Sequence, residues 1–494
     1  MPMPRHLLSK STFLSGLQCE KRLYLQKHRR DLLPDISTSQ QFIFSQGTQV
    51  GELAQQLFPG GKDATPESYF DFRPSIAQTK KWIDDGVEVI YEAAFQFDQV
   101  LVAVDLLVKD GGGWKAYEVK SSTEVKDVHR DDAAIQYHVI TQSGIALKDI
   151  SIVHINNTYA RNGEISIHEL FHIESVLQDV LASQAWIPQK IDDLKTVVQN
   201  RIEPQVPIGP HCSDPYECDL KAYCWSHVPE YSVFNIKNLR SKIKWELYDQ
   251  GIMQLEAIPD AFPLGANQRM QVESEKSAEI IIQKEAIENF LHQLNYPLYF
   301  LDFETFSTAV PIMDGTRPYQ QIVFQYSLHI QEAPGAELVH SEHLADASQS
   351  NFLPDLIQQM IQDCGASGDI IVYNQGFESG KIRDLIEMYP SVQLQLEGML
   401  SRIVDLMVPF QKRWYYTPEM KGSYSIKYVL PALVPELSYK DLEVQEGGAA
   451  SSLFSMMVAG LFEGNTEKTR EDLLEYCKLD TLAMVRILEE LHKL

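Results

Sequence analysis

Two apolar runs in the C-terminal two-fifths of the chain predict buried strands that lie next to acidic residues. The first run, Tyr296 to Leu301, continues directly into Asp302 and Glu304, and the second covers Asp369 to Tyr373. Because side chains alternate between the two faces of a strand, we expect Asp302 and Glu304 to point the same way. The pattern therefore predicts a pair of carboxylates at the end of a buried strand.

Further along the chain, an apolar repeat of helical period contains Tyr476 and Asp480. These two residues are one turn apart and lie on the same face of the predicted helix. Carboxylates that are crowded together repel one another unless a cation joins them. Two Mg²⁺ or Mn²⁺ ions bound by Asp302, Glu304 and Asp480 would clamp the attacking and leaving oxygens of a phosphodiester. Tyr476 would then orient the attacking water.

These motifs resemble those of the DnaQ-like 3′–5′ exonucleases, in the subgroup whose last motif reads Y-x-x-x-D. The resemblance covers roughly residues 285–494 and implies a ribonuclease H-like fold. The middle motif runs from Tyr373 to Glu378, and the family usually has Asp where this chain has Glu378. Glu can still bind metal, but its extra methylene moves the carboxylate. Asp405 matches an acid that often follows in such folds, and a helix or strand cap explains it equally well.

The N-terminal half contains a second candidate site. The stretch from Glu92 to Leu107 alternates or runs apolar and predicts a strand that carries Asp105. A glycine triplet then predicts a turn, and Trp114 to Lys120 reads as the returning strand. Glu118 and Lys120 share one face of that strand. A metal between Asp105 and Glu118 would polarise a phosphate and supply hydroxide, while Lys120 positions that water or offsets charge in the transition state.

This second motif resembles the PD-(D/E)xK nuclease superfamily in its RecB-like branch, which implies a restriction-endonuclease-like α/β domain. The resemblance continues into a predicted helix at Asp132 to Tyr137, where that branch carries a Gln, here Gln136, and a Tyr. Upstream, Gly47 to Glu52 lies where many RecB-like nucleases have a metal-binding His. This chain has no His there, so Glu52 either substitutes as a ligand or is an exposed helix carboxylate.

Four cysteines flank this predicted domain. Cys19 stands near the N-terminus, and Cys212, Cys218 and Cys224 follow the domain with the spacing C-x5-C-x5-C. Thiolates in such a set can converge on a soft metal centre, either Zn²⁺ or a [4Fe–4S] cluster. RecB-like nucleases of the AddB type and the CRISPR-associated iron–sulfur relatives carry one Cys before the nuclease core and three after it, commonly as C-x2-C-x5-C. This resemblance favours the cluster, and four unlinked cysteines are the alternative.

The charge balance limits the range of partners. The chain has a net charge of −25, which argues against a basic surface that binds nucleic acid everywhere. Lys and Arg are instead concentrated locally, in places beside Trp or Tyr, as suits a single strand whose phosphates meet cations while its bases stack on rings. Ordinary solvated surface is the alternative for each cluster. The clusters are Lys21, Arg22, Lys27, Arg29 and Arg30; Lys237, Arg240, Lys242 and Lys244 beside Trp245; and Lys412, Arg413, Lys421 and Lys427 around Trp414, Tyr415 and Tyr416.

The composition, with 44% hydrophobic and 22% charged residues, is typical of a globular enzyme. Residues 1–10 lack the apolar core of a signal peptide, and no apolar stretch is long enough to span a bilayer. Six cysteines do not make a secreted disulfide framework. Cys364 and Cys477 are expected to be core thiols, and His211, beside Cys212, is an outside candidate ligand. We therefore expect a cytoplasmic protein without a membrane partner.

A length of 494 residues predicts two to four domains. We expect an iron–sulfur nuclease domain at 1–230, a mostly helical connector at 231–284 and an exonuclease domain at 285–494. The arrangement resembles a prokaryotic family that fuses a RecB-like iron–sulfur nuclease to a DnaQ-like exonuclease domain. It implies a metal-dependent nuclease with two active sites that hydrolyses DNA, single-stranded or at ends. Two alternatives stay open: an RNA exonuclease, and a nucleic-acid-binding scaffold whose sites have decayed, as Glu378 and the missing His would suggest.

Overall fold

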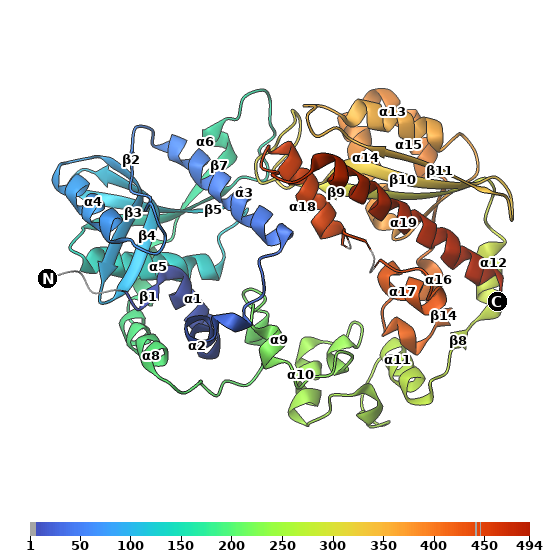
Figure 1. Ribbon diagram of the computed structural model, residues 1–494, viewed down its shortest axis with the longest axis horizontal. Coiled ribbons are helices and arrows are strands. Elements are labelled where there is room, and N and C mark those ends of the chain that lie inside the picture. The colour runs from blue at the N-terminus through green and yellow to red at the C-terminus, as the bar shows by residue number, and fades with distance from the viewer. Residues whose placement is uncertain (1–5, 440–441, 445) are drawn as a thin grey trace. The chain divides into compact units, whose positions relative to one another are not determined.

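The computed structural model describes residues 6–439, 442–444 and 446–494 (Figure 1). The chain divides into two compact units: unit 1 is Met1–His227 with Thr308–Tyr319, and unit 2 is Val228–Ser307 with Gln320–Leu494. Each unit combines helices with a β-sheet. Residues 1–5, half of the segment predicted to lack a signal-peptide core, lie outside the description. No helix in the described part is both long and apolar enough to cross a bilayer.

Over its described residues, unit 1 contains a seven-stranded sheet of order β2-β3-β4-β5-β6-β7, with β1 paired to β4. β3, β4 and β5 form an antiparallel meander, and β6 runs parallel to β5 after a helical crossover, α5. The strands are β1 (Leu8–Ser9), β2 (Lys62–Asp63), β3 (Val89–Phe97), β4 (Val100–Asp110), β5 (Gly113–Lys120), β6 (Leu147–Ile155) and β7 (Phe171–Ser175).

The predicted strand that carries Asp105 and the returning strand that ends at Lys120 are confirmed as β4 and β5. The apolar stretch from Glu92 to Leu107 is not continuous, because a tight turn separates β3 from β4. The central residues of this turn, Asp98 and Gln99, have φ angles of +45° and +60°, as a two-residue hairpin turn requires. The dipeptide Asp-Gln contains no glycine, so the sequence gives little warning of this turn.

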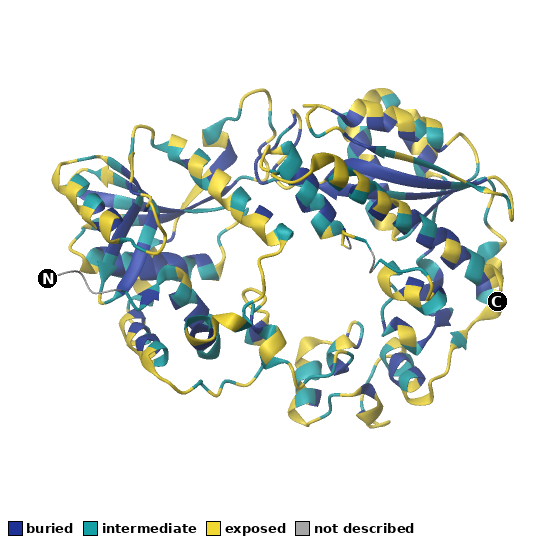
Figure 2. Ribbon diagram, in the orientation of Figure 1, coloured by how far each residue is buried: buried dark blue, intermediate teal, exposed yellow. Residues whose placement is uncertain are grey.

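Helices pack on both faces of the unit 1 sheet. On one face Ala133 and Ile135 of α5 pack with Leu194 of α8, and on the other Val50 of α3 packs with Tyr117 of β5. Figure 2 shows the central strands mostly buried and the helices buried mainly on one side. The helices are α1 (Lys10–Gln18), α2 (Glu20–His28), α3 (Thr38–Ala54), α4 (Arg73–Asp84), α5 (Asp127–Gln142), α6 (Ile167–Leu170), α7 (Leu177–Ser183), α8 (Ile187–Gln199) and α9 (Lys221–Cys224).

A segment from the second half of the chain, Thr308–Tyr319, belongs to unit 1, and we call it the arm. Ala309 and Val310 join a buried apolar core of unit 1. The Ala309 N–H donates to Gln46 Oε1 at 2.6 Å, and the Arg161 guanidinium donates to two arm carbonyls, each at 3.0 Å. The expected domain of residues 285–494 includes this segment, because a loop between two strands carries no periodicity that reveals a distant partner.

Over its described residues, unit 2 contains a five-stranded sheet of order β11-β10-β9-β12-β13. The predicted strands at Tyr296 to Leu301 and Asp369 to Tyr373 are confirmed as β9 and β12, although β9 begins at Leu298 and continues to Phe306. β9 is antiparallel to β10 and parallel to β12. The strands are β8 (Ile281–Ile282), β9 (Leu298–Phe306), β10 (Ile322–Gln331), β11 (Leu338–Leu344), β12 (Asp369–Val372), β13 (Ile403–Asp405) and β14 (Tyr415–Tyr416), and β8 pairs with β14.

The longest helix of unit 2, α19, lies along β9 and β10 (Figure 1). The predicted connector at residues 231–284 is helical over α10 and α11 and surrounds a small core of Val233, Leu247 and Val272. The helices are α10 (Ser241–Asp249), α11 (Ala266–Ser277), α12 (Lys284–Leu291), α13 (Leu353–Asp363), α14 (Gln375–Met388), α15 (Gln393–Leu400), α16 (Val408–Gln411), α17 (Ile426–Leu433), α18 (Gly447–Val458) and α19 (Thr466–His492).

Candidate active sites

Three carboxylates meet in unit 2, two of them buried and that of Asp302 half-buried, and we call this group the carboxylate site. Asp302 and Glu304 project from one face of β9, and Asp480 comes from α19. One carboxylate oxygen from each lies within 4.8 Å of those of the other two. Only 8% of Glu304 and 7% of Asp480 is exposed. The predicted convergence of these three residues is therefore present, because the strand places two acids on one face and the helix crosses that face.

Polar contacts between β10 and α19 fix the position of the helix. Gln325 of β10 donates to the Leu473 carbonyl of α19 at 2.8 Å. The Thr481 hydroxyl lies 2.8 Å from Ser327 Oγ and 2.8 Å from His329 Nδ1. On β10, Ser327 and Gln325 are the cross-strand partners of the two acidic positions of β9. The pairing of β9 with β10 therefore fixes the positions of Asp302 and Glu304, and β10 also positions α19, which carries Asp480.

Burial raises the pKa of every carboxyl group in the carboxylate site, and repulsion from neighbouring carboxylates adds to this for Asp302 and Glu304. Burial, followed by the charges of Asp480 and Glu304, raises the pKa of Asp302 well above its usual value. Burial and the Asp480 charge raise the pKa of Glu304 to about 8. Burial raises the pKa of Asp480 to about 6. Ionising all three groups together is costly, and a cation between them would remove that cost.

Two tyrosines surround Asp480. Tyr476, one turn earlier on α19, hydrogen-bonds to it, and the Tyr439 hydroxyl donates to Asp480 Oδ1 at 2.6 Å. Lys427 Nζ lies 5.8 Å from the Tyr439 ring centroid and 5.9 Å from that of Tyr476. Sequence reasoning found Tyr476 but missed Tyr439, since a tyrosine that follows a helix in irregular structure has no fixed spacing to Asp480. Lys427 was predicted only as part of a basic cluster.

The Glu of the middle motif, Glu378, is buried in the first turn of α14 but is not part of the three-carboxylate group. Its charge is among those that raise the pKa of Asp302, and burial raises its own pKa to about 8. Among the described atoms, Glu378 Oε2 has no hydrogen-bond partner. A buried, unpaired carboxylate oxygen beside the carboxylate site is a fourth candidate metal ligand.

Asp405 acts as a cap in this structure, which is one of the two roles left open for it. Its carboxylate accepts hydrogen bonds from the N–H groups of Asn374 at 3.0 Å, Gln375 at 3.1 Å and Met407 at 2.9 Å. Asn374 has a φ of +88° and is the residue at which α14 begins. Asp405 therefore stabilises the turn that presents Glu378.

Unit 1 brings the predicted motif residues together, and we call this group the lysine–carboxylate site. Lys120 Nζ donates to Glu118 Oε1 at 2.7 Å and to Asp132 Oδ2 at 2.5 Å. Gln136 Nε2 donates to Glu118 Oε2 at 2.8 Å and to Asp132 Oδ1 at 3.0 Å. Asp105 Oδ2 accepts the Val119 N–H at 2.5 Å. The predicted helix that contains Gln136 is confirmed as α5, which places its Gln and Asp over the end of β5.

Sequence reasoning missed two charged residues of the lysine–carboxylate site. Lys10, the first residue of α1, lies 2.5 Å from Glu118 Oε1 and 3.6 Å from Asp132 Oδ1. Glu92 of β3 has a φ of +52°, and burial followed by the Glu118 charge raises its pKa to about 7. Positive φ inside a strand marks an irregularity that a period-two pattern does not reveal. Burial and the Glu118 charge also raise the pKa of Asp105 well above its usual value.

Glu52 is exposed on α3, and none of the contacts described for Asp105, Glu118 or Lys120 involves it. The side of α3 that carries Val50 packs into the core, and Glu52, two residues later, lies on nearly the opposite side of the helix. Of the two roles predicted for Glu52, the structure places it as an exposed helix carboxylate. The additional acid of this site is Glu92 instead.

The four cysteines predicted to act together, Cys19, Cys212, Cys218 and Cys224, line one small pocket. All are free thiols, and burial raises the pKa of Cys218 and Cys224. His211 lines the same pocket, and its Nε2 lies 3.9 Å from Cys212 Sγ. Among the described residues, no three of these sulfur and nitrogen atoms lie within 4.8 Å of one another. The prediction that Cys364 and Cys477 are buried thiols is confirmed.

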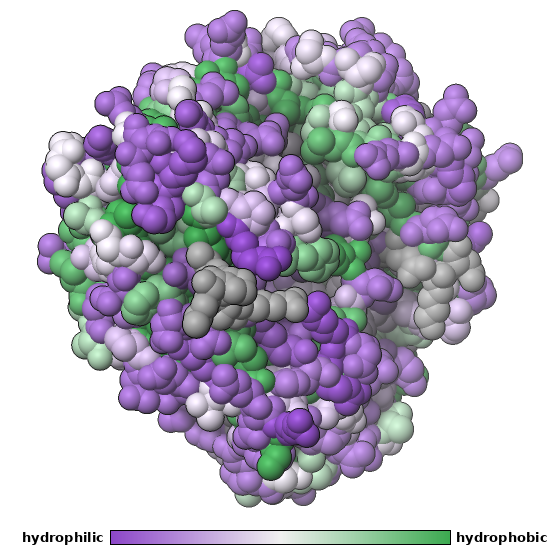
Figure 3. Space-filling model, turned by 60° about the vertical axis from the view of Figure 1, so that its left-hand side comes forward, coloured by the Kyte–Doolittle hydropathy of each residue, from purple (hydrophilic) through white to green (hydrophobic). Residues whose placement is uncertain are grey.

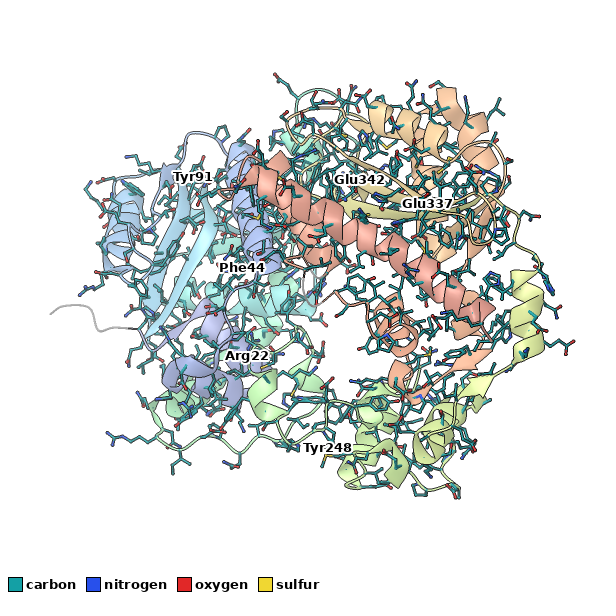
Figure 4. All side chains as sticks on the ribbon, turned by 45° about the vertical axis from the view of Figure 1, so that its right-hand side comes forward. Arg22, Phe44, Tyr91, Tyr248, Glu337 and Glu342 are labelled. Atoms are coloured by element: carbon teal, nitrogen blue, oxygen red, sulfur yellow. The ribbon has the colours of Figure 1, made fainter. Side chains whose placement is uncertain are left out.

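Several predicted basic residues have structural partners. Arg22, labelled in Figure 4 on α2, donates to Asp219 at 2.9 Å beside the cysteine pocket, and Lys21 pairs with Glu203 at 2.8 Å. Arg413 is only 3% exposed and lies over the Tyr416 ring. These contacts fit the alternative of structural or surface residues. Figure 3 shows one face of the molecule, which is mainly hydrophilic with separated hydrophobic patches.

Comparisons with known proteins place part of the chain among relatives. Residues 299–425 match a family described as "Domain of unknown function (DUF2779)". The chain is 26% identical to "Uncharacterized protein UU173" of Ureaplasma parvum serovar 3 over 233 residues, which are 43% of this chain and 33% of that protein. It is 26% identical to "Uncharacterized protein MG366 homolog" of Mycoplasma pneumoniae over 205 residues, 38% of this chain and 31% of that protein. The chain thus spans about a third of the length of these curated relatives.

Proposed function

We propose that this chain is a metal-dependent nuclease that hydrolyses phosphodiester bonds of DNA, with a separate active site in each unit. The observation that carries the proposal is the convergence of Asp302, Glu304 and Asp480, whose ligand oxygens lie within 4.8 Å of one another. Unit 2 would be a DnaQ-like 3′–5′ exonuclease of ribonuclease H-like fold. Its sheet, with the acid-bearing strand in the middle between antiparallel and parallel neighbours, supports that assignment.

The carboxylate site suits Mg²⁺ or Mn²⁺. Its donors are hard carboxylate oxygens, the type that these ions prefer. Burial raises the pKa of all three acids, and carboxylate charges raise those of Asp302 and Glu304 further, so a bound cation would favour their ionised forms. Glu378, with an unpartnered buried oxygen, would complete the ligand set. When bound, two such ions would stabilise the attacking and leaving oxygens of the phosphodiester.

The surrounding side chains would hold this centre and its water. Tyr439 and Tyr476 hydrogen-bond to Asp480 and so fix the direction of its carboxylate. Burial raises the pKa of the Tyr476 phenol, which keeps it protonated and able to donate to an attacking water. Lys427 is exposed at the edge of the two rings, where a cation would meet the phosphates of a bound strand.

Unit 1 would be a RecB-like nuclease of the PD-(D/E)xK superfamily. The grouping of Asp105, Glu118 and Lys120 at the end of a strand pair, with Gln136 on Glu118, supports this assignment. Glu118 would be a metal ligand with Asp105. Lys120 would orient the attacking water or offset the charge of the transition state, and Asp132 holds the Lys120 ammonium in place.

The proposal is tested with end-labelled single- and double-stranded DNA and RNA, in Mn²⁺, Mg²⁺ or EDTA. Asp302→Ala and Asp480→Ala should each reduce metal-dependent release of 3′ nucleotides about a hundredfold or more, the scale of losing one transition-state stabiliser. Glu337→Ala, at an exposed position before β11, is the matched control and should keep full activity. Unchanged 3′ digestion in both aspartate variants would overturn the exonuclease assignment.

A second pair of variants tests the unit 1 site. Lys120→Ala should lose a cleavage activity that survives in Asp302→Ala, because the two residues belong to different sites. If Asp302→Ala already removes all cleavage with every metal and substrate, the unit 1 assignment as an active nuclease fails.

We also propose that Cys19, Cys212, Cys218 and Cys224 hold a [4Fe–4S] cluster. Their common pocket supports a shared centre. Four Cys thiolates are the usual ligand set of a [4Fe–4S] cluster. Lys21, Arg22 and Lys221 line the pocket and would offset the negative charge of thiolates.

Metal analysis of anaerobically purified protein tests the cluster. Iron and sulfide at about four each per chain are expected, as a Cys₄ cubane requires. Cys19→Ala should lose the centre and make unit 1 more sensitive to limited proteolysis than unit 2, since metal binding energy is also folding energy. Cys364→Ala, in a buried thiol outside the pocket, should keep its iron. Zinc at about one per chain without iron would contradict the proposal.

A further inference from the structure

The ammonium of Lys10 contacts an oxygen of Glu118, one of the two acids proposed to bind metal in unit 1. Its Nζ is 2.5 Å from Glu118 Oε1, and Lys120 Nζ is 2.7 Å from the same oxygen. The other oxygen, Oε2, accepts a hydrogen bond from Gln136 at 2.8 Å. Both oxygens of Glu118 are therefore engaged. A divalent ion between Asp105 and Glu118 would have to compete with these donors, above all with the two ammonium groups, for the Glu118 carboxylate.

Of the two lysines, Lys10 is held the less firmly. Lys120 makes short contacts to both acids, at 2.7 Å to Glu118 and 2.5 Å to Asp132. Lys10 makes one short contact, and its distance to Asp132 is 3.6 Å. About 24% of the Lys10 side chain is exposed, so the ammonium can reach solvent directly when it leaves the site.

The backbone of Lys10 is held by contacts that do not involve its side chain. Leu8 and Ser9 form β1, which pairs with Val100 and Leu101 of β4. Ser9 also caps α1 in a reciprocal capping box with Thr12. These contacts hold the first turn of α1 against the sheet. The long side chain of Lys10 can therefore swing out of the site and return to it without any change of fold.

We propose that Lys10 competes with a divalent metal ion for Glu118 in the lysine–carboxylate site. The Lys10 ammonium pairs with Glu118 until an ion displaces it. In the metal-free chain the two ammonium groups together supply two positive charges beside Glu118 and Asp132. A divalent ion supplies the same charge from one point, closer to the oxygen, and expels Lys10. Unit 1 would then cleave only where the metal concentration is high enough to overcome this lysine. The inference rests on the proposed metal-dependent function of unit 1.

Mn²⁺ binding to the full chain tests the proposal by calorimetry or electron paramagnetic resonance. The parent carries Asp302→Asn and Asp480→Asn, so that the carboxylate site does not contribute. Adding Lys10→Met should tighten Mn²⁺ binding about tenfold, as expected when one charge-assisted hydrogen bond no longer competes. Lys190→Met, which removes another half-buried ion pair of unit 1, with Glu20 at 2.9 Å, should bind like the parent. Adding Glu118→Gln to Lys10→Met should remove binding.

Equal or weaker Mn²⁺ binding by folded Lys10→Met would overturn the competitor role while leaving a metal site in unit 1. If no variant binds Mn²⁺, the proposed metal function of unit 1 fails, and the competitor role fails with it. A measurement on the wild-type chain guards against misfolding of Lys10→Met. Mn²⁺ should increase reductive methylation of Lys10, followed by mass spectrometry, and leave that of Lys190 unchanged. Labelling of Lys10 that does not respond to saturating Mn²⁺ would also overturn the proposal.

Discussion

Each acid of the carboxylate site destabilises the metal-free fold when it is ionised, because burial raises its pKa. Glu304 is 8% exposed and faces two other acids, so its ionised form is less stable in the folded chain than in the unfolded chain. A native chain keeps such a group only if something else repays the cost, and a bound cation does so. The stability of the fold should therefore depend on both the pH and the metal concentration.

The first prediction concerns Glu304→Gln. Because the pKa of Glu304 is raised from 4.5 to about 8, the folded chain binds more protons than the unfolded chain between these pH values. The free energy of unfolding in EDTA should therefore fall as the pH rises through this window. Glu304→Gln removes this titration and should be roughly 1–3 kcal/mol more stable than wild type at pH 8, since one pKa unit is worth about 1.4 kcal/mol.

Denaturant unfolding at pH 5 and pH 8, followed for unit 2, measures this effect. Glu337→Gln is the control, because Glu337 is exposed at the edge of the sheet (Figure 4). With Mg²⁺ the order should reverse, since only the wild type gains binding energy. A Gln variant that is less stable than wild type at pH 8 in EDTA would contradict the account.

At the scale of elements, α19 is placed by polar contacts rather than by apolar packing alone. Gln325, Ser327 and His329 project from β10 toward the helix and bond to Leu473 and Thr481. A helix that packs only through apolar side chains could rotate or slide by a fraction of a turn and stay buried. Hydrogen bonds have stricter geometry, and these keep Asp480 over the two acids of β9.

The second prediction concerns Thr481→Val. Val has nearly the shape of Thr but leaves Ser327 and His329 without their partner in the core, which should cost about 1–3 kcal/mol. Because Asp480 is adjacent, Mg²⁺ affinity of the carboxylate site should weaken about tenfold, the scale of losing a group that orients a ligand. Thr466→Val, at an exposed position in the first turn of α19, should change neither quantity. Loss of stability with unchanged Mg²⁺ affinity would show that Thr481 supports the fold alone.

At the scale of the whole molecule, neither unit is one continuous stretch of the chain, because the arm of unit 1 is inserted between two segments of unit 2. The strand that carries Asp302 ends at Phe306, and the arm that follows contributes to the core of unit 1 before β10 returns to unit 2. Val310 and Thr316 of the arm are 7% and 0% exposed. Unit 1 therefore depends on residues that lie far from the rest of it in the sequence.

The third prediction concerns Val310→Asp. A charge at this buried position should destabilise unit 1 by roughly 2 kcal/mol or more, since burying a Val side chain is worth about 1.5–3 kcal/mol. Hydrogen exchange should then increase in α3 and β5, which share the core with Val310. Val339→Asp, on β11 with 55% of Val339 exposed, is the control and should leave unit 1 unchanged. Faster exchange confined to β9 and β10 would contradict the assignment of the arm.

Periodicity and spacing were sufficient to predict the candidate catalytic residues. The alternation of a strand put Asp302 and Glu304 on one face, and the turn of a helix put Tyr476 beside Asp480, because both patterns are local consequences of backbone geometry. The same reasoning located the strands that carry Asp105 and Lys120. It also grouped the four cysteines that line one pocket.

Only the tertiary structure decided which distant residues complete each site. Lys10 and Tyr439 reach their acids from α1 and from the segment after α17, at distances that no local period encodes. Glu52 is exposed and makes none of the described contacts, whereas Glu92, at a backbone irregularity inside a strand, has its pKa raised by burial and by the Glu118 charge. Long-range packing determines these contacts, and a single sequence contains no local signal for them. The sequence alone therefore determined the local elements and their chemistry, and the fold determined how they meet.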